Sequence, residues 1–168
     1  MGRYAGVLLA AAALTVATAG TAASAEAPDV AWTDQFGTSS WDEGRGVAVS
    51  PQGTVTVTGY TDGALPGQTS SGDADVFVRQ YHRDGSVAWT DQFGSSSCDW
   101  GYGVAVSPQG TVTVTGYTGG ALPGQTSSGS GDVFVRQYHR DGSVAWTDQF
   151  GTSSWDEEIG RASCRERV

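Results

Sequence analysis

The chain has 168 residues, a formal net charge of −9 and no lysine, so it offers neither a basic patch for nucleic acid nor a basic helix for an anionic membrane. Its only cysteines are Cys98 and Cys164, too few for a disulfide framework. Stability must therefore come from packed secondary structure.

The first 25 residues predict a secretory signal peptide. Arg3 precedes an uncharged, mainly apolar run that ends in Ala23-Ser24-Ala25, a pattern typical of a cleavage site. The run is too short and too weakly apolar for a membrane span, which needs about 20 strongly apolar residues. We therefore expect residues 1–25 to be removed, and the mature protein to be secreted, extracellular and not inserted in a membrane.

Residues 26–157 are dominated by an internal repeat. The string AWTDQFG begins at Ala31, Ala88 and Ala145, which gives a period of 57 residues. The first two repeats, 31–87 and 88–144, differ at only seven positions. Such near identity predicts one structural unit that recurs along the chain.

Each repeat predicts four short antiparallel strands. In the first repeat, β-branched runs flank the turn Pro51-Gln52-Gly53, and two further runs flank Asp84-Gly85, a strong hairpin signal. The expected strands are 46–50, 54–61, 75–82 and 87–93. No stretch of the mature chain has a helical period. We therefore predict an all-β fold of β-propeller blades, each a four-stranded antiparallel sheet.

Two complete blades are expected, at 44–93 and 101–150, and a further strand at 30–36 precedes them. In a closed propeller this N-terminal strand would complete the last blade and fasten the ring. Two blades cannot close a ring, so we expect the chain to be a fragment of a larger propeller. The alternative is that several short chains assemble into one ring.

Several short motifs recur in each repeat. In the first they are Asp42-x-Gly44-x-Gly46-Val47-Ala48-Val49, Gly53-x-Val55-x-Val57-Thr58-Gly59-x-Thr61, Leu65-Pro66, and Asp75-Val76-Phe77-Val78 followed by Asp84-Gly85. In the second they recur at Asp99, Gly110, Leu122 and Asp132. This pattern resembles SBBP repeats, a bacterial β-propeller family, although that family more often has an aromatic residue where Leu65 stands. The resemblance covers residues 30–157 and implies an extracellular propeller with no single activity.

The last eleven residues, 158–168, do not follow the repeat. Position 158 should be glycine to match Gly44 and Gly101, but it is glutamate, and the register never recovers. One back-translation of EIGRASCRERV resembles a common sequencing-library adapter. We therefore expect natural sequence to stop at Glu157 and residues 158–168, Cys164 included, to be a non-native tail.

The differences between the first two repeats all fall on one side of the expected sheets, the side of the linker 37–45 and the long loop 62–74. They are Thr38/Ser95, Trp41/Cys98, Glu43/Trp100, Arg45/Tyr102, Asp62/Gly119, Asp73/Ser130 and Ala74/Gly131. Variable loops on a constant scaffold commonly bind ligands. The alternative is that long loops accumulate changes that tight turns do not tolerate.

Aromatic side chains beside carboxyl groups are expected to be exposed on this side, and we call these residues the candidate rim. They are Trp41, Asp42, Glu43, Asp99, Trp100, Tyr102, Trp155 and Asp156. Aromatic faces next to carboxylates suit stacking on sugars or anchoring of a protein partner. The expected ligand is an extracellular glycan or protein, with no nucleic acid partner.

Repeated residues elsewhere are expected to be structural. Arg79 and Arg136 are predicted to pair with repeated acids. The repeated tryptophans of the fourth strands are predicted to pack between blades; they are Trp32, Trp89 and Trp146.

We predict no catalytic residue, cofactor or metal site. His82 and His139 lie beside a hairpin turn without a partner motif, and Ser130 interrupts the pattern Asp73-x-Asp75 in the second repeat. An active site normally needs one blade to carry residues that the others lack. The expected function is non-enzymatic binding or adhesion. The alternatives are a structural surface spacer array and a fragment of a propeller hydrolase with its active site in missing blades.

Overall fold

The computed structural model describes residues 29–153. The expected signal peptide (1–25), Trp155, Asp156 and the expected tail (158–168) lie outside these residues. Within residues 29–153 every regular element is a β-strand, and no helical segment meets the length and hydropathy of a membrane span. This confirms the all-β prediction.

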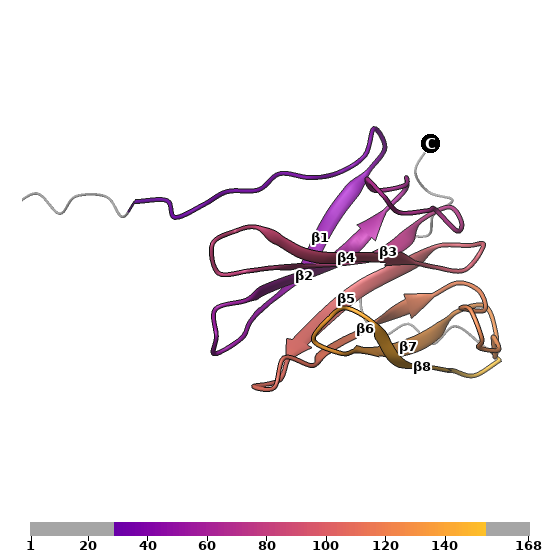
Figure 1. Ribbon diagram of the computed structural model, residues 1–168. Helices are drawn as coiled ribbons and strands as arrows, with labels where there is room; N and C mark the ends of the chain where they lie inside the picture. Colours follow the sequence, from indigo (N-terminus) through magenta and orange to yellow (C-terminus); the bar gives the residue numbers. More distant parts are fainter. Residues whose placement is uncertain (1–28, 154–168) are drawn as a thin grey trace, which may run out of the picture. The chain divides into compact units, whose positions relative to one another are not determined.

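Eight strands form two separate four-stranded sheets (Figure 1). The first sheet contains β1 (Asp42–Val49), β2 (Val55–Thr61), β3 (Asp75–Tyr81) and β4 (Val87–Phe93). The second contains β5 (Asp99–Val106), β6 (Val112–Thr118), β7 (Asp132–Tyr138) and β8 (Val144–Phe150). Strand order follows the sequence, and all neighbours are antiparallel, as expected for blades.

The tight turns lie at the ends of hairpins as the sequence predicts. The Gly53 N–H donates to the Ser50 carbonyl (2.9 Å) and the Gly85 N–H to the His82 carbonyl (3.0 Å). Both glycines have positive φ, 84° and 86°, which explains why glycine ends each turn. Because the strands alternate in direction, these turns share one end of the sheet, and the linker and long loop share the other.

The main hydrophobic core lies between the two sheets. Its fully or almost fully buried members are Val76, Val78, Phe93, Val112, Val114, Leu122, Phe134 and Tyr138. A fully buried Val or Phe side chain contributes about 1.5–3 kcal/mol relative to its exposed state. The core therefore fixes how β4 meets β7.

Three residue pairs make up what we call the β4–β7 contact. Trp89 packs on Tyr138 (5.3 Å between ring centroids), Asp91 pairs with Arg136 (3.5 Å), and Phe93 meets the edge of Phe134 (5.4 Å). The guanidinium of Arg136 also lies over the Phe93 ring, and the Tyr138 hydroxyl donates to Asp91. The predictions for Arg136 and Trp89 are confirmed.

Residues 31–36 make the same contact one repeat earlier, although they are not a strand. Trp32 stacks on Tyr81 (5.3 Å), Asp34 pairs with Arg79 (3.4 Å), and Phe36 meets Phe77 (5.3 Å). Residues 30–36, which are expected to form a strand in a closed ring, form none in this structure, because neither sheet offers this segment a hydrogen-bonding neighbour. Its side chains nevertheless occupy on the first sheet the place that β4 occupies on the second.

Candidate functional site

The candidate rim divides into an exposed part and a buried part. Trp41 exposes 58% of its surface, whereas Trp100 exposes 7% and Asp99 none. The sequence-based expectation that Asp99 and Trp100 are exposed is therefore wrong. Trp100 packs on Tyr60 of the preceding repeat, whereas Asp99 is held by Ser95 of its own repeat.

Asp42 and Asp99 hold the linkers that lead into β1 and β5. The Thr38 N–H donates to Asp42 (2.7 Å), and the Ser95 N–H donates to Asp99 (2.6 Å). The hydroxyl groups of Thr38 and Ser95 reach the same carboxylates. The Thr38/Ser95 difference thus preserves one interaction, and both aspartates have a structural task.

Asp99 lies near a second buried carboxylate. A side chain at Gly94 would collide with Asp75 Oδ1 and Asp99 Oδ2, so glycine there lets the two groups approach. Burial, which outweighs the hydrogen bonds from Thr118 and Ser95, raises the pKa of Asp99 to about 6, and the charge of Asp75 adds to the rise.

The raised pKa predicts how stability depends on pH. Because the folded-state pKa of about 6 exceeds the ordinary 3.8, protonation of Asp99 stabilises the fold fully below pH 3.8. This contribution, on the order of 3 kcal/mol, is lost as the pH rises through 6. Asp99→Asn should remove that loss, so urea midpoints measured from pH 4 to 7 should fall less steeply than in the parent.

Asp42→Asn is the matched control, since Asp42 has the same place in the first repeat and is only half-buried. It shows whether the loss of any linker carboxylate gives the same change of slope. Equal slopes for the parent and Asp99→Asn would contradict the prediction.

Trp100 is the centre of an aromatic cluster at the junction of the sheets. Its ring lies 5.9 Å from Tyr60 of β2, 5.4 Å from Tyr117 of β6 and 6.5 Å from Tyr102. The buried members of the cluster are Tyr60, Ala74, Cys98, Trp100 and Tyr117. Several positions that differ between the repeats are therefore packing positions and not ligand contacts.

Glu43 and Arg45 occupy the corresponding positions of β1. The Tyr60 hydroxyl donates to Glu43 (2.9 Å), and Arg45 pairs with Glu43 (3.1 Å). The Arg45 guanidinium also lies over the rings of Tyr60 (5.2 Å) and Tyr102 (5.3 Å). Burial alone would raise the pKa of Glu43, but the Tyr60 hydrogen bond and the Arg45 charge lower it below its ordinary value.

Trp41 remains as an exposed aromatic residue on this rim. It borders an open groove whose other lining residues are Gln35, Phe36, Gly37, Thr38, Ser40 and Asp42. The hydroxyl and amide groups of the lining can donate and accept hydrogen bonds. An exposed ring beside such groups can stack on a flat apolar surface of a ligand while its neighbours bind polar atoms.

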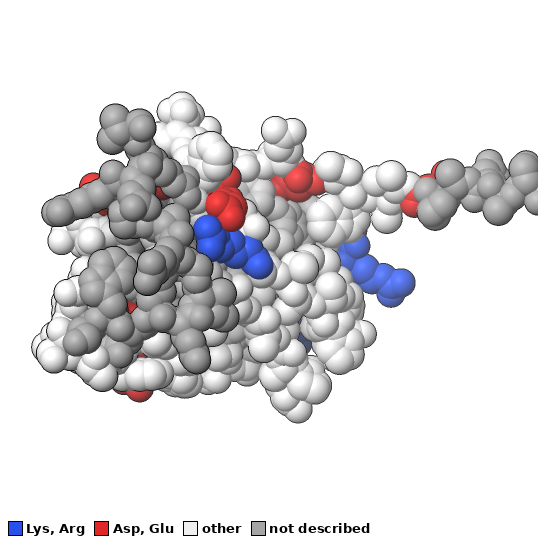
Figure 2. Space-filling model, turned by 180° about the vertical axis from the view of Figure 1, so that it is seen from behind, with Lys and Arg blue, Asp and Glu red and all other residues white. Residues whose placement is uncertain are grey.

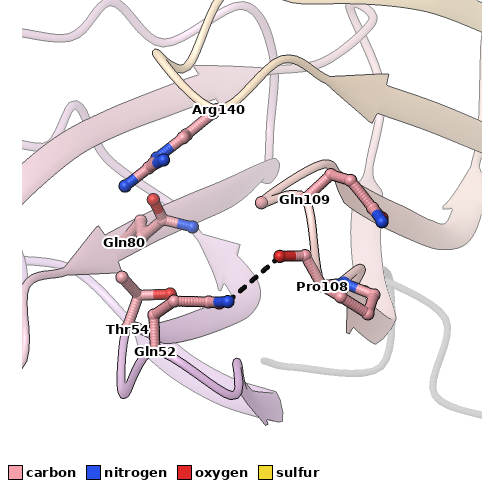
Figure 3. Close-up of a pocket in the computed structure, with 7 residues that line it drawn as sticks. Gln52, Thr54, Gln80, Pro108, Gln109 and Arg140 are labelled. Atoms are coloured by element: carbon pink, nitrogen blue, oxygen red, sulfur yellow. Dashed lines mark hydrogen bonds between the residues drawn. The ribbon is translucent and has the colours of Figure 1, made fainter.

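A small pocket at the opposite end of the sheets was missed by sequence reasoning. It has a volume of about 130 Å³ and is lined by Gln52, Thr54, Gln80, Pro108, Gln109, Gly110 and Arg140. The Gln52 side chain donates to the Pro108 carbonyl (3.2 Å), which joins the tight turns of the two sheets (Figure 3). The turn Pro-Gln-Gly, present in both repeats, was the signal that could have found it.

The surface carries no concentrated positive charge on the face seen in Figure 2. There the basic side chains of the described residues stand apart, with acidic groups close to one of them. Among residues 29–153, no group of three or more His, Cys, Asp or Glu side chains is placed to hold a metal ion. Neither a protein-family model nor a curated protein matches the chain.

Proposed function

We propose that this protein is a secreted, non-enzymatic binding protein whose ligand docks in the groove beside Trp41. The observation that carries the proposal is the 58% exposure of Trp41 at the edge of a groove with a polar lining. An indole with 58% of its surface exposed supplies a stacking surface for a partner. The leader-like residues 1–25 support an extracellular location.

The ligand class that fits this groove best is a glycan. The apolar face of a sugar ring can stack on the Trp41 indole, while its hydroxyl groups meet Gln35, Thr38 and Ser40. The Asp42 carboxylate at the start of β1 accepts the Thr38 N–H and so holds the linker side of the groove against the sheet.

The two sheets are proposed to be blades of an SBBP-type propeller. The support is that the same side-chain contact recurs at the sequence period, once between β4 and β7 and once between residues 31–36 and β3. A contact that repeats in this way can be propagated to further blades. The hydrolase alternative would require catalytic groups beyond the described residues.

Trp41→Ala is expected to weaken glycan binding by about tenfold or more, because it removes the stacking surface. The test is a glycan-array screen of the full chain, followed by affinity measurement on the best glycan. Trp41→Phe, which keeps an aromatic ring, should retain part of the affinity.

The control for location is His82→Ala, since His82 is exposed at a tight turn on the other side. It should bind like the parent. The proposal fails if no glycan binds, or if Trp41→Ala binds as tightly as the parent.

A further inference from the structure

Within residues 29–153, the two sheets leave two complementary faces exposed. We call the outer side of the second sheet the donor face; its most exposed members are Trp146 (45%) and Phe150 (51%) of β8. We call the outer side of the first sheet the acceptor face; its β1 residues Val47 and Val49 are 67% and 64% exposed. Large apolar side chains on a sheet face favour burial against a partner.

The contact between the sheets shows what covers each face. Phe93 stands where Phe150 stands one repeat later, and packing against β7 reduces its exposure to 5%. Val104 and Val106, the equivalents of Val47 and Val49, are half-buried and pack against the core cluster. Each uncovered face therefore has a covered counterpart, and the partner of that counterpart is the opposite face of a neighbouring repeat.

The acceptor face is already half occupied by residues 31–36. Their sequence, AWTDQF, is identical to residues 145–150, which include most of β8. Trp32, Asp34 and Phe36 cover the β3 part of this face and leave the valines of β1 open. Residues 31–36 thus form a cap that β8 of another molecule could replace side chain for side chain.

We propose that a second copy of this chain binds head to tail, with β8 of one copy displacing the cap from the first sheet of the next. Asp148 would then meet Arg79 and Tyr81, as Asp91 meets Arg136 and Tyr138 within the chain. The two surfaces differ, so the interface is heterologous and generates a ring or an open filament.

The cap sets the strength of this association. The incoming β8 makes the same interactions that the cap gives up, so the net gain is the burial of Val47, Val49 and their half-buried neighbours Val55 and Val57. The cap is tethered beside its site, and such segments compete at effective concentrations of about millimolar. Association should therefore rise with protein concentration, and it should rise further when the cap is weakened.

Sedimentation velocity of the purified full chain over a concentration series tests the proposal. The parent should form larger species, and Phe150→Asp should weaken their formation by about tenfold or more. If circular dichroism shows that Phe150→Asp does not fold, Trp146→Glu serves as the donor-face variant in its place. The matched control is Val144→Asp: Val144 is 46% exposed, and its counterpart Val87 stays 47% exposed although the sheets are packed. That control should associate like the parent.

Two further variants distinguish this interface from non-specific association. Val49→Asp should block the acceptor face, and a mixture of Val49→Asp with Phe150→Asp should form a one-to-one complex, because each copy keeps one intact face. Trp32→Ala should strengthen association, since it weakens the cap and leaves both faces intact. A monomeric parent together with a monomeric Trp32→Ala would overturn the proposal, as would equal effects of Phe150→Asp and Val144→Asp.

Discussion

Replacing Gln92 by leucine is expected to lower the free energy of unfolding by about 3–5 kcal/mol, although the two side chains have similar volumes. The side-chain oxygen of Gln92 accepts the Leu65 N–H (2.9 Å). Its side-chain NH₂ group donates to the Gly63 carbonyl (2.9 Å) and to the Asp75 carboxylate (2.8 Å). Leucine would leave the buried Leu65 N–H without this acceptor. It would also remove one donor each from the Gly63 carbonyl and from Asp75, which then keep only the donors Thr61 and Ser71. One side chain thus fastens the long loop to β3 and β4.

Gln92→Glu separates the hydrogen bonds from the packing. Glutamate still accepts the Leu65 N–H, but it places a second carboxylate at the 2.8 Å position beside Asp75. Repulsion would raise the folded-state pKa of the new carboxyl group, so its protonated form stabilises the fold at low pH and this support is lost as pH rises. We expect most of the lost stability to return at acid pH, where the protonated group can donate to Asp75.

Urea unfolding followed by tryptophan fluorescence measures both variants. Gln52→Leu is the control, because Gln52 is exposed in a turn and its loss should cost less than about 0.5 kcal/mol. A loss below about 1 kcal/mol for Gln92→Leu would contradict the assigned role.

The strands could be predicted from the sequence because their signals are local. The β-branched runs and the turns at Gly53 and Gly85 depend on neighbouring residues only, and three of the four strands in the first repeat fall within one residue of their expected bounds. β1 begins at Asp42, four residues before the expected Gly46, because the chain pairs across a bulge. A bulge leaves little trace in a hydrophobic pattern.

The candidate rim could be predicted only in part, because burial there depends on contacts between repeats. Glu43 and Trp100 have equivalent positions, and the sequence alone suggests that their exchange is a change in a ligand-binding loop. In the structure Trp100 packs between Tyr60 and Tyr117, residues that are far apart in the sequence. Trp41 differs because 58% of its surface is exposed in the structure.

The structural role of Gln92 is indicated by its recurrence in the repeat, which composition alone does not reveal. Gln35, Gln92 and Gln149 recur at the repeat period, and Gln149 makes the same three hydrogen bonds in the second sheet, to Leu122, Gly120 and Asp132. A polar residue at a strand position that is repeated without change is a candidate for a buried hydrogen-bond network. Its partners, which lie up to 29 residues away, still required the structure.

Gly116→Ala should destabilise the protein by about 3 kcal/mol or more. The bulge between Gly101 and Gly103 brings the Trp100 carbonyl oxygen onto the place that a Cβ at position 116 would need. The Phe134 ring, 2.8 and 2.9 Å from that place, closes the other side. A methyl group there must push apart β5 and β6 or move a core ring.

Gly124→Ala separates this steric effect from the backbone effect of losing a glycine. Position 124 has a φ of +78°, and no atom lies within 4 Å of the place that its Cβ would take, so alanine should cost only about 1–2 kcal/mol of backbone strain. Urea unfolding of both variants gives the two values, and an equal loss would mean that crowding at the bulge is not what requires glycine.

Gly59 faces the Glu43 carbonyl in the same way in the first sheet. A strand glycine that recurs opposite a bulge is therefore required by close approach of the neighbouring backbone, which gives a physical reason for one of the glycines in the repeat motif.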